Sequence, residues 1–417
     1  MKKIVFFLGL VLLSAACEKE EMSMGMAEGI DPYARGKSIS LTRAEQDMTL
    51  SANNFAFDLF AQIRKERKGA SVLLSPFSAS MALSMAATGA EGETERQMRA
   101  VLGFESIAKE EMGEYFSKMV SGLMKADPHV TLRIANSIWM DKLFPVKEAF
   151  IQHAKETFSS TVAARDFLLP ATLTEINDWV AEQTDDTIKE LLDKLDPNIK
   201  MVLLNALSFD GKWRYVFSGT KKGSFTDADG KTRKADMMYA TGELLYADKE
   251  GYELLCLPYG TGAFSLYVVL PPAGTDFAEA PFDRALWEGL LSSLRTCDVH
   301  VTLPSFVFRD SHNLVDPLRA LGMELPFQTA ADFSAITDIP VCIGKVDQKT
   351  FIEVNEKGTK ATAATAVQLM VTSAGPDAPG DVPEYESVDF TADRPFFYLI
   401  RESSTGTLLY IGQAGSL

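Results

Sequence analysis

Histidine is scarce in this chain, and the few histidines form no recognisable site. The sequence of 417 residues holds four of them, at His129, His153, His300 and His312. It contains no HExxH pair and no GxSxG elbow, which argues against a zinc protease and an α/β-hydrolase. Histidines and cysteines share no metal-ligand spacing, and no phosphate-binding loop occurs. The sequence therefore predicts no metal site, no cofactor and no enzymatic activity.

Positive charge is in the minority, and cysteine is rare. The net charge of -16 argues against nucleic acid as a partner. With 46% hydrophobic residues, the chain can bury a large core without disulfides or metal. Beyond the N-terminus, Cys256, Cys297 and Cys342 are odd in number and have no close spacing. We expect them to be buried free thiols.

The N-terminus has the pattern of a short bacterial secretory leader. Two lysines precede the apolar run Ile4–Leu13, which is too short to span a membrane, and small residues then lead to Cys17. This order resembles a lipoprotein processing site, although Ser14 stands where leucine is more usual. It predicts a signal peptide over 1–17 and a lipid on Cys17 as membrane anchor. A simple signal peptide with an incidental cysteine is the alternative.

Residues 18–45 are predicted to be a flexible tether between this anchor and the body. Acidic residues follow the cysteine at once, and 25–36 lacks a periodic apolar pattern. The expected location is the outer membrane of a bacterium, on its periplasmic or cell-surface face.

Helical patterns dominate the first half of the body, and strand patterns dominate the second. The first helix is predicted to start with Ser51 as N-cap, with Phe55, Leu59 and Ile63 on one face. The regular alternation of a doubly wound fold is missing, which predicts an α+β fold with large, mostly antiparallel sheets. No repeat or Pro-rich linker divides residues 46–417, so we expect a single domain.

Residues 353–372 alternate like a strand but carry unusually small side chains. A flexible linker or weak helix is the alternative for this segment taken alone. One face holds nothing charged and nothing larger than leucine, so it can be buried in a sheet. That face consists of Thr359, Ala361, Ala363, Thr365, Val367, Leu369 and Val371.

Four motifs, in order along the chain, resemble those of the serpins. The most specific is Asn205–Trp213, reading N-A-L-S-F-D-G-K-W. Leu74–Ser78 is similar to the start of the second serpin helix, and Asp393–Phe396 to the C-terminal signature. Phe351–Val367 resembles the hinge of an inhibitory reactive loop. The resemblance covers 46–417 and implies a serpin fold with an exposed reactive loop at about 357–394.

The resemblance also implies a function. Serpins trap a protease as a covalent acyl-enzyme while the cleaved loop inserts into a sheet as a new strand. The partner expected here is a serine protease, bound by a monomer. Small hinge side chains without proline favour inhibition over the alternative, a non-inhibitory serpin-fold lipoprotein that acts as a binding protein. The hinge residues are Glu356, Gly358, Thr359, Ala361, Ala363 and Thr365.

Serpin spacing from Glu356 places the reactive bond between Thr372 and Ser373. Neighbouring residues offer alternative bonds, at Leu369, Met370 and Val371. The nearby loop lacks lysine and arginine, which favours elastase-, chymotrypsin- or subtilisin-like targets over trypsin-like ones. Papain-like cysteine proteases are a further class. The stretch from Ser373 to Arg394 is longer than in a typical serpin.

Support residues follow from the resemblance as well. Ser75, Ser78 and Asn205 resemble the buried polar cluster under the sheet that serpin strands part to open. Gln348 stands where many serpins have histidine, so the cluster is expected to lack a titrating member. Trp213 resembles the aromatic residue at the top of the sheet, where the loop first enters. Plain core or cap roles are the alternative for each.

Overall fold

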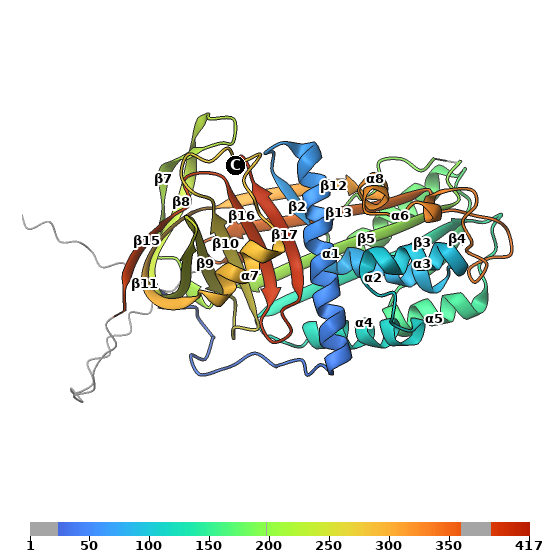
Figure 1. Ribbon diagram of the computed structural model, residues 1–417, viewed down its shortest axis with the longest axis horizontal. Coiled ribbons are helices and arrows are strands. Elements are labelled where there is room, and N and C mark those ends of the chain that lie inside the picture. Colours follow the sequence, from blue (N-terminus) through green and yellow to red (C-terminus); the bar gives the residue numbers. More distant parts are fainter. Residues whose placement is uncertain (1–23, 197, 360–384) are drawn as a thin grey trace, which may run out of the picture.

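The computed structural model describes residues 24–196, 198–359 and 385–417 (Figure 1). Several predicted functional residues lie outside these ranges: Cys17 with the signal peptide 1–17, Ala361, Ala363, Thr365, Leu369, Met370, Val371, Thr372 and Ser373.

Eight α-helices are present in the described residues, most of them in the first half of the chain. Their bounds are α1 (Arg43–Arg67), α2 (Pro76–Thr88), α3 (Gly92–Leu102), α4 (Lys109–Leu123), α5 (Glu148–Phe158), α6 (Pro170–Gln183), α7 (Arg284–Ser292) and α8 (Val315–Ala320), with the short 3-10 turn η1 (Leu325–Phe327).

Helix α1 begins earlier than predicted. Its N-cap is Thr42, whose hydroxyl accepts a hydrogen bond from the Glu45 backbone N–H while the Glu45 carboxylate accepts from the Thr42 N–H. This capping box satisfies two free backbone donors at once, so the helix starts there and Ser51 lies inside it. The prediction of Ser51 as N-cap was wrong. The predicted apolar face, which includes Phe55 and Leu59, is buried.

Two large sheets make up the rest of the molecule. The six-stranded sheet has the order β12 (Phe306–Asn313), β13 (Lys345–Asn355), β14 (Gly358–Thr359), β5 (Met201–Lys212), β3 (Val130–Asp141) and β4 (Thr161–Arg165). The nine-stranded sheet has the order β15 (Ser387–Thr391), β11 (Arg295–Pro304), β8 (Thr232–Lys249), β9 (Tyr252–Pro258), β10 (Phe264–Leu270), β16 (Phe396–Glu402), β17 (Leu408–Ala414) and β2 (Val72–Leu74), with β7 (Gly219–Thr226) beside β8. Most pairs are antiparallel, so the predicted α+β class is confirmed.

Helix α2 lies between the two sheets. Every residue from Pro76 to Thr88 is buried, as a helix that is apolar on all sides requires. It contacts β5 of the six-stranded sheet and β17 of the nine-stranded one. Figure 1 shows β5 and β13 running lengthwise past α1 and α2, with the strands of the nine-stranded sheet gathered at one end. The opposite face of the six-stranded sheet carries a separate apolar cluster, which includes Ile176 and Val180 of α6.

Residues 24–42 pack along the body. Gly25–Met26 form β1, which pairs with β6 (Tyr215–Val216), and Ala27 and Ile30 are buried. These contacts hold parts of the stretch 18–45, which the sequence predicts to be a flexible tether, against the body. Their few apolar side chains are irregularly spaced, and their partners are distant in sequence, so no local pattern reveals the docking.

Candidate functional site

The six-stranded sheet is split along the line where β13 meets β5. The two strands pair directly, in parallel, from Lys345 with Val202 to Thr350 with Leu207. Beyond that point β14 separates them, pairing Thr359 with Val354 on one side and with Gly211 on the other. Gly358 and Thr359 of the predicted hinge thus lie in the opening of a sheet that is closed further down.

Gly358 fits this place because no side chain can. A Cβ at this position would lie 2.1 Å from the Gly211 carbonyl oxygen, well inside van der Waals contact. The preceding turn contains half-buried Glu356 and is fixed by the Asn355 carboxamide, which accepts a hydrogen bond from the Lys357 N–H at 2.9 Å. The turn and the glycine together let the chain reverse from β13 into β14.

Thr359 is the last hinge residue described, and it is buried. Its side-chain oxygen lies 2.5 Å from the Tyr259 hydroxyl, deep under the top of the sheet. Burial raises the pKa of the Tyr259 phenol far above its ordinary value, so this hydroxyl stays neutral. Thr359, the first residue of the face that the sequence predicts to be buriable, is therefore already buried in the sheet.

Trp213 holds the hinge turn through its backbone and side chain. Its indole N–H donates to the Asn355 carbonyl at 2.8 Å, and its backbone N–H donates to the Lys357 carbonyl at 3.1 Å. The buried indole ring stacks on Tyr259 with ring centres 4.5 Å apart. Trp213 and Tyr259 together support the hinge from one side.

Four of the predicted support residues form one buried network, which we call the seam cluster: Ser75, Ser78, Asn205 and Gln348. The Asn205 side-chain oxygen accepts hydrogen bonds from the Ser78 hydroxyl at 2.7 Å and from the Gln348 amide at 2.8 Å. Gln348 also donates to the Ser75 carbonyl at 2.8 Å and accepts from its N–H at 2.9 Å. Asn205 and Gln348 face each other directly across the β5–β13 pairing. The cluster thus joins α2 to both β5 and β13.

Trp213 lies apart from this cluster, at the hinge, as the aromatic residue expected at the top of the sheet. Trp213 lies just beyond the end of β5 with the hinge, whereas Asn205 lies near its middle. Ser75 occupies the N-cap position of α2, but its side chain makes no capping bond; its hydroxyl oxygen lies 2.9 Å from that of Ser78 instead.

Three further residues of the site were not identified from the sequence. Tyr259 bonds to Thr359, Gly211 makes room for Gly358, and Asn136 of β3 accepts a hydrogen bond from the Asn205 amide. Gly211 belongs to the quoted motif, but nothing local marks its contact. Tyr259 and Asn136 reach the site only through tertiary packing.

The outer face of the seam is covered by the chain that follows α6. Ile188, Leu191 and Leu192 pack with Val202 and Leu204 of β5, in a cluster that also contains Phe351 of β13. Strand separation therefore has to displace an apolar cover on one face as well as break the polar seam cluster on the other.

The far end of the predicted loop is also a strand. Residues 387–391 form β15, which pairs in parallel with 298–302 of β11 at the edge of the nine-stranded sheet. Within the predicted loop of about 357–394, residues 358–359 belong to β14 and residues 387–391 to β15.

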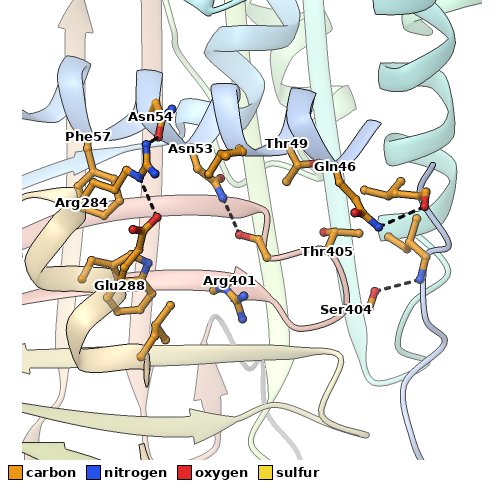
Figure 2. Close-up of a pocket in the computed structure, with 16 residues that line it drawn as sticks. Gln46, Thr49, Asn53, Asn54, Phe57, Arg284, Glu288, Arg401, Ser404 and Thr405 are labelled. Atoms are coloured by element: carbon orange, nitrogen blue, oxygen red, sulfur yellow. Dashed lines mark hydrogen bonds and ion pairs between the residues drawn. The ribbon is translucent and has the colours of Figure 1, made fainter. Parts of the chain in front are cut away.

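A separate pocket of about 450 Å³ lies between α1, α7 and the β16–β17 turn (Figure 2). Two of its polar side chains have partners in the pocket wall: Arg284 donates to Asn54 at 2.7 Å, and Asn53 donates to the Gly406 carbonyl at 2.9 Å. None of the predicted site residues lines it. We therefore place the functional site at the split sheet.

In the described part of the chain, no group of three or more histidine, cysteine, aspartate or glutamate residues is arranged to hold a metal ion. Likewise, no helix within the described ranges has the length and apolar character needed to cross a bilayer.

Comparison with known proteins gives a consistent result. The family model described as Serpin (serine protease inhibitor) matches residues 50–416. An uncharacterized serpin-like protein of Methanosarcina mazei is 32% identical over 378 residues, covering 87% of this chain and 86% of its own. The leukocyte elastase inhibitor of Sus scrofa is 32% identical over 394 residues, covering 88% and 99%.

Solved structures of proteins in this family have the same fold as this chain. The thermophilic serpin Tengpin in its native state superposes with a TM-score of 0.78 at 28% identity, covering 95% of this chain and 100% of that one. Human thyroxine-binding globulin complexed with its hormone gives a TM-score of 0.80 at 25% identity, covering 89% and 99%.

Proposed function

This chain belongs to the serpin family, and we propose that it is a suicide inhibitor of serine endopeptidases. Protease inhibition in general is supported by the family model and by relatives named as leukocyte elastase inhibitors. The observation that carries the specific proposal is the hinge: Gly358 and Thr359 already pair between β13 and β5, at the head of a sheet still closed below.

The proposed reaction uses the protease's own chemistry. The target's serine oxygen attacks the carbonyl carbon of Thr372, and the amine of Ser373 leaves with a proton, which gives an ester between the two proteins. The freed end of the loop then extends β14 between β13 and β5. Insertion carries the attached protease away before water hydrolyses the ester. Thr372 and Ser373 lie outside the described residues, so this bond rests on serpin spacing alone.

Insertion has an identifiable driving force. Burying Val367, Leu369 and Val371 contributes about 1.5 to 3 kcal/mol each, and new ladder hydrogen bonds add to this. The seam cluster and the direct pairing of residues 345–350 with 202–207 oppose insertion. The balance keeps residues 345–350 paired with 202–207 in the intact protein and lets the cleaved loop proceed.

The target class follows from the loop sequence. No lysine or arginine lies near Thr372 on either side. The specificity pocket of the target protease is therefore expected to accept small or medium apolar residues. We propose elastase-, chymotrypsin- or subtilisin-like proteases as targets, with papain-like cysteine proteases as a further class, and a monomer as the active form.

We further propose that a lipid on Cys17 anchors the protein to a bacterial outer membrane. Met24 donates its N–H to Thr241 of β8, next to the strand β11 that carries β15. Met24 follows Cys17 by seven residues, which span at most about 25 Å. Such an anchor holds the reactive-loop end of the molecule close to the lipid surface.

The test is incubation with a panel of serine proteases followed by denaturing electrophoresis and mass spectrometry. We expect a covalent complex that survives boiling, together with a released C-terminal peptide that begins at Ser373. The same proteases with blocked active-site serines are the control and should give no complex. Cleavage without a complex across the whole panel contradicts the inhibitor proposal and favours a non-inhibitory binding protein.

A further inference from the structure

The six-stranded sheet ends in a strand whose outer edge has no strand beside it. Among the described residues, β4 is last in the strand order and pairs only with β3. Figure 1 shows it at the end of the molecule away from β7 and β8. Its sequence, T-V-A-A-R, contains no proline and a single charged residue, Arg165. Proline and several charges are what usually keep an exposed edge from pairing with a further strand.

Two residues of β4 direct their backbone groups away from the sheet. The Arg165 carbonyl faces β3, where it accepts the Lys142 N–H at 2.7 Å. Backbone direction alternates along a strand, so the backbone groups of Val162 and Ala164 face outward. The Ala164 carbonyl is capped locally, since the Arg165 guanidinium donates to it at 2.9 Å. The other outward backbone groups of these two residues can bind a partner strand.

A groove of about 630 Å³ lies over the same strand, between its side chains and α6. The small side chains of Thr161 and Ala163 line it from β4, and Trp139 of β3 lies directly opposite Ala163. The Trp139 indole N–H donates to the Ser137 hydroxyl at 2.8 Å, which fixes the ring. Trp179 of α6 meets this ring edge to face, with ring centres 6.1 Å apart. The two tryptophans give the groove an apolar wall.

The α6 side of the groove is acidic. Glu175 is paired with Arg165 at 2.7 Å. Asp178 and Glu182 also line the groove, and within the described ranges neither forms an ion pair. Two such carboxylates beside a tryptophan favour a cationic side chain as the occupant.

The free edge and the groove form one surface. A strand added beside β4 directs every second side chain to the face that carries Thr161 and Ala163, and therefore into the groove next to α6. Backbone hydrogen bonds then supply affinity, and the groove selects the side chains. Leu168 and Leu169, which are 70% and 54% exposed, extend the apolar surface just beyond the end of β4.

We propose that β4 binds an extended segment of another protein as an additional strand, with lysine or arginine at alternate positions reaching Asp178 and Glu182. A second copy of this chain is disfavoured, because it would bring two acidic groove walls together. The proposal does not depend on protease inhibition, since no hinge or seam-cluster residue lines the groove.

The probe is a short fluorescent peptide of alternating lysine and valine, titrated into the full-length protein at low ionic strength. Fluorescence anisotropy should show saturable binding, with a Kd in about the micromolar to millimolar range. Hydrogen–deuterium exchange should slow at the Val162 and Ala164 amides when the peptide binds. Two control peptides should bind at least about tenfold more weakly: one with glutamate in place of lysine, and one N-methylated along one edge.

Matched charge reversals separate the groove from the overall charge of the protein. Asp178→Lys combined with Glu182→Lys should weaken binding about tenfold or more, through lost attraction and added repulsion. Glu110→Lys combined with Glu114→Lys makes the same charge change at exposed positions of α4 with the same i, i+4 spacing. This control should bind the peptide within about twofold of the parent.

A proline at the edge tests the strand pairing from the protein's side. Ala164→Pro removes an outward N–H and should weaken binding about as much as the charge reversal. Ala164→Ser keeps this N–H and should bind like the parent. The N-methylated peptide makes the same test on the unaltered protein and covers the case in which the proline variant does not fold.

Absence of saturable binding, or equal losses in the two charge-reversed double variants, would overturn the proposal. Equal affinity for the N-methylated and unmodified peptides would show that the acidic wall attracts cations without strand pairing, which contradicts it as well. If light scattering shows the parent as a dimer that Ala164→Pro dissociates, the edge belongs to a second copy and the proposal is wrong.

Discussion

Strands β5 and β13 meet in two different ways along their length. In the lower half, residues 202–207 and 345–350 pair directly, and Asn205 bonds Gln348 across the seam. In the upper half the same strands are held apart by Gly358–Thr359. In the lower half, the neutral seam cluster holds the two strands together. In the upper half, Thr359 lies between the strands and packs against Tyr259, which stacks on Trp213. The difference identifies which contacts have to break for the strand to grow.

The largest expected effect comes from the upper half. Thr359→Arg places a guanidinium at a position that is 1% exposed, beside Tyr259. Burying this charge without a partner costs several kcal/mol, so the cleaved loop no longer starts its strand. The yield of covalent complex, measured by densitometry, should fall by about tenfold or more as the protein becomes a substrate. Thr359→Ser keeps the hydroxyl and should retain the yield; equal yields for both variants would refute insertion from this point.

The next effect comes from the lower half. Asn205→Ala leaves the Ser78 hydroxyl and the Gln348 amide without their shared acceptor. Each buried hydrogen bond lost in this way costs about 1 kcal/mol or more, so the free energy of unfolding, measured from urea titrations, should fall by about 2 to 3 kcal/mol. Exposed Asn198→Ala should change it by less than about 0.5 kcal/mol. A similar small change for Asn205→Ala would show that the cluster does not hold the seam.

A smaller effect is expected at Gly358, where the hinge turn leads into β14. Gly358→Ala forces its Cβ against the Gly211 carbonyl, which should lower the free energy of unfolding by about 1 to 3 kcal/mol. Gly230→Ala is the control, because Gly230 has a positive φ of 80° but open space around it. Should the two variants lose the same stability, the close packing of β14 on β5 would be in doubt.

The smallest effect concerns pH. Gln348→His places a titratable ring, of ordinary pKa about 6.5, in a cluster of neutral amides and hydroxyls. Burial disfavours the charged ring, so the unfolded state binds protons more readily and the added instability appears as pH falls below about 6.5. Unfolding titrations at pH 5 and pH 8 should show a drop of about 1 kcal/mol beyond that of Gln348→Leu. Parallel pH profiles for the two variants would contradict a closed, dry cluster.

Much of the site could be read from the sequence because its motifs are local. The hinge pattern around Gly358, the Asn205–Trp213 motif and the start of α2 are each contiguous, and the structure brings Ser75, Ser78, Asn205 and Gln348 into one network. The α+β class likewise followed from the separate helical and strand patterns.

Contacts between distant segments could not be read in this way. Tyr259 meets Thr359 across 100 positions, and the Arg214 guanidinium donates to the Pro32 carbonyl across 182. Nothing local in the sequence marks either pair. The helix start at Thr42 is different: its Thr42 and Glu45 spacing is a local capping-box signal, which the sequence analysis passed over in favour of Ser51.

Thermal unfolding of the protein before and after cutting of its loop tests the central claim most directly, namely that Thr359 is the first residue of a strand waiting to enter between β13 and β5. Insertion buries several further side chains, so the cut protein should unfold at least about 10 °C higher than the intact one. Thr359→Arg, cut in the same way, should show no such rise. An unchanged or lower unfolding temperature for the cut parent protein would contradict the account.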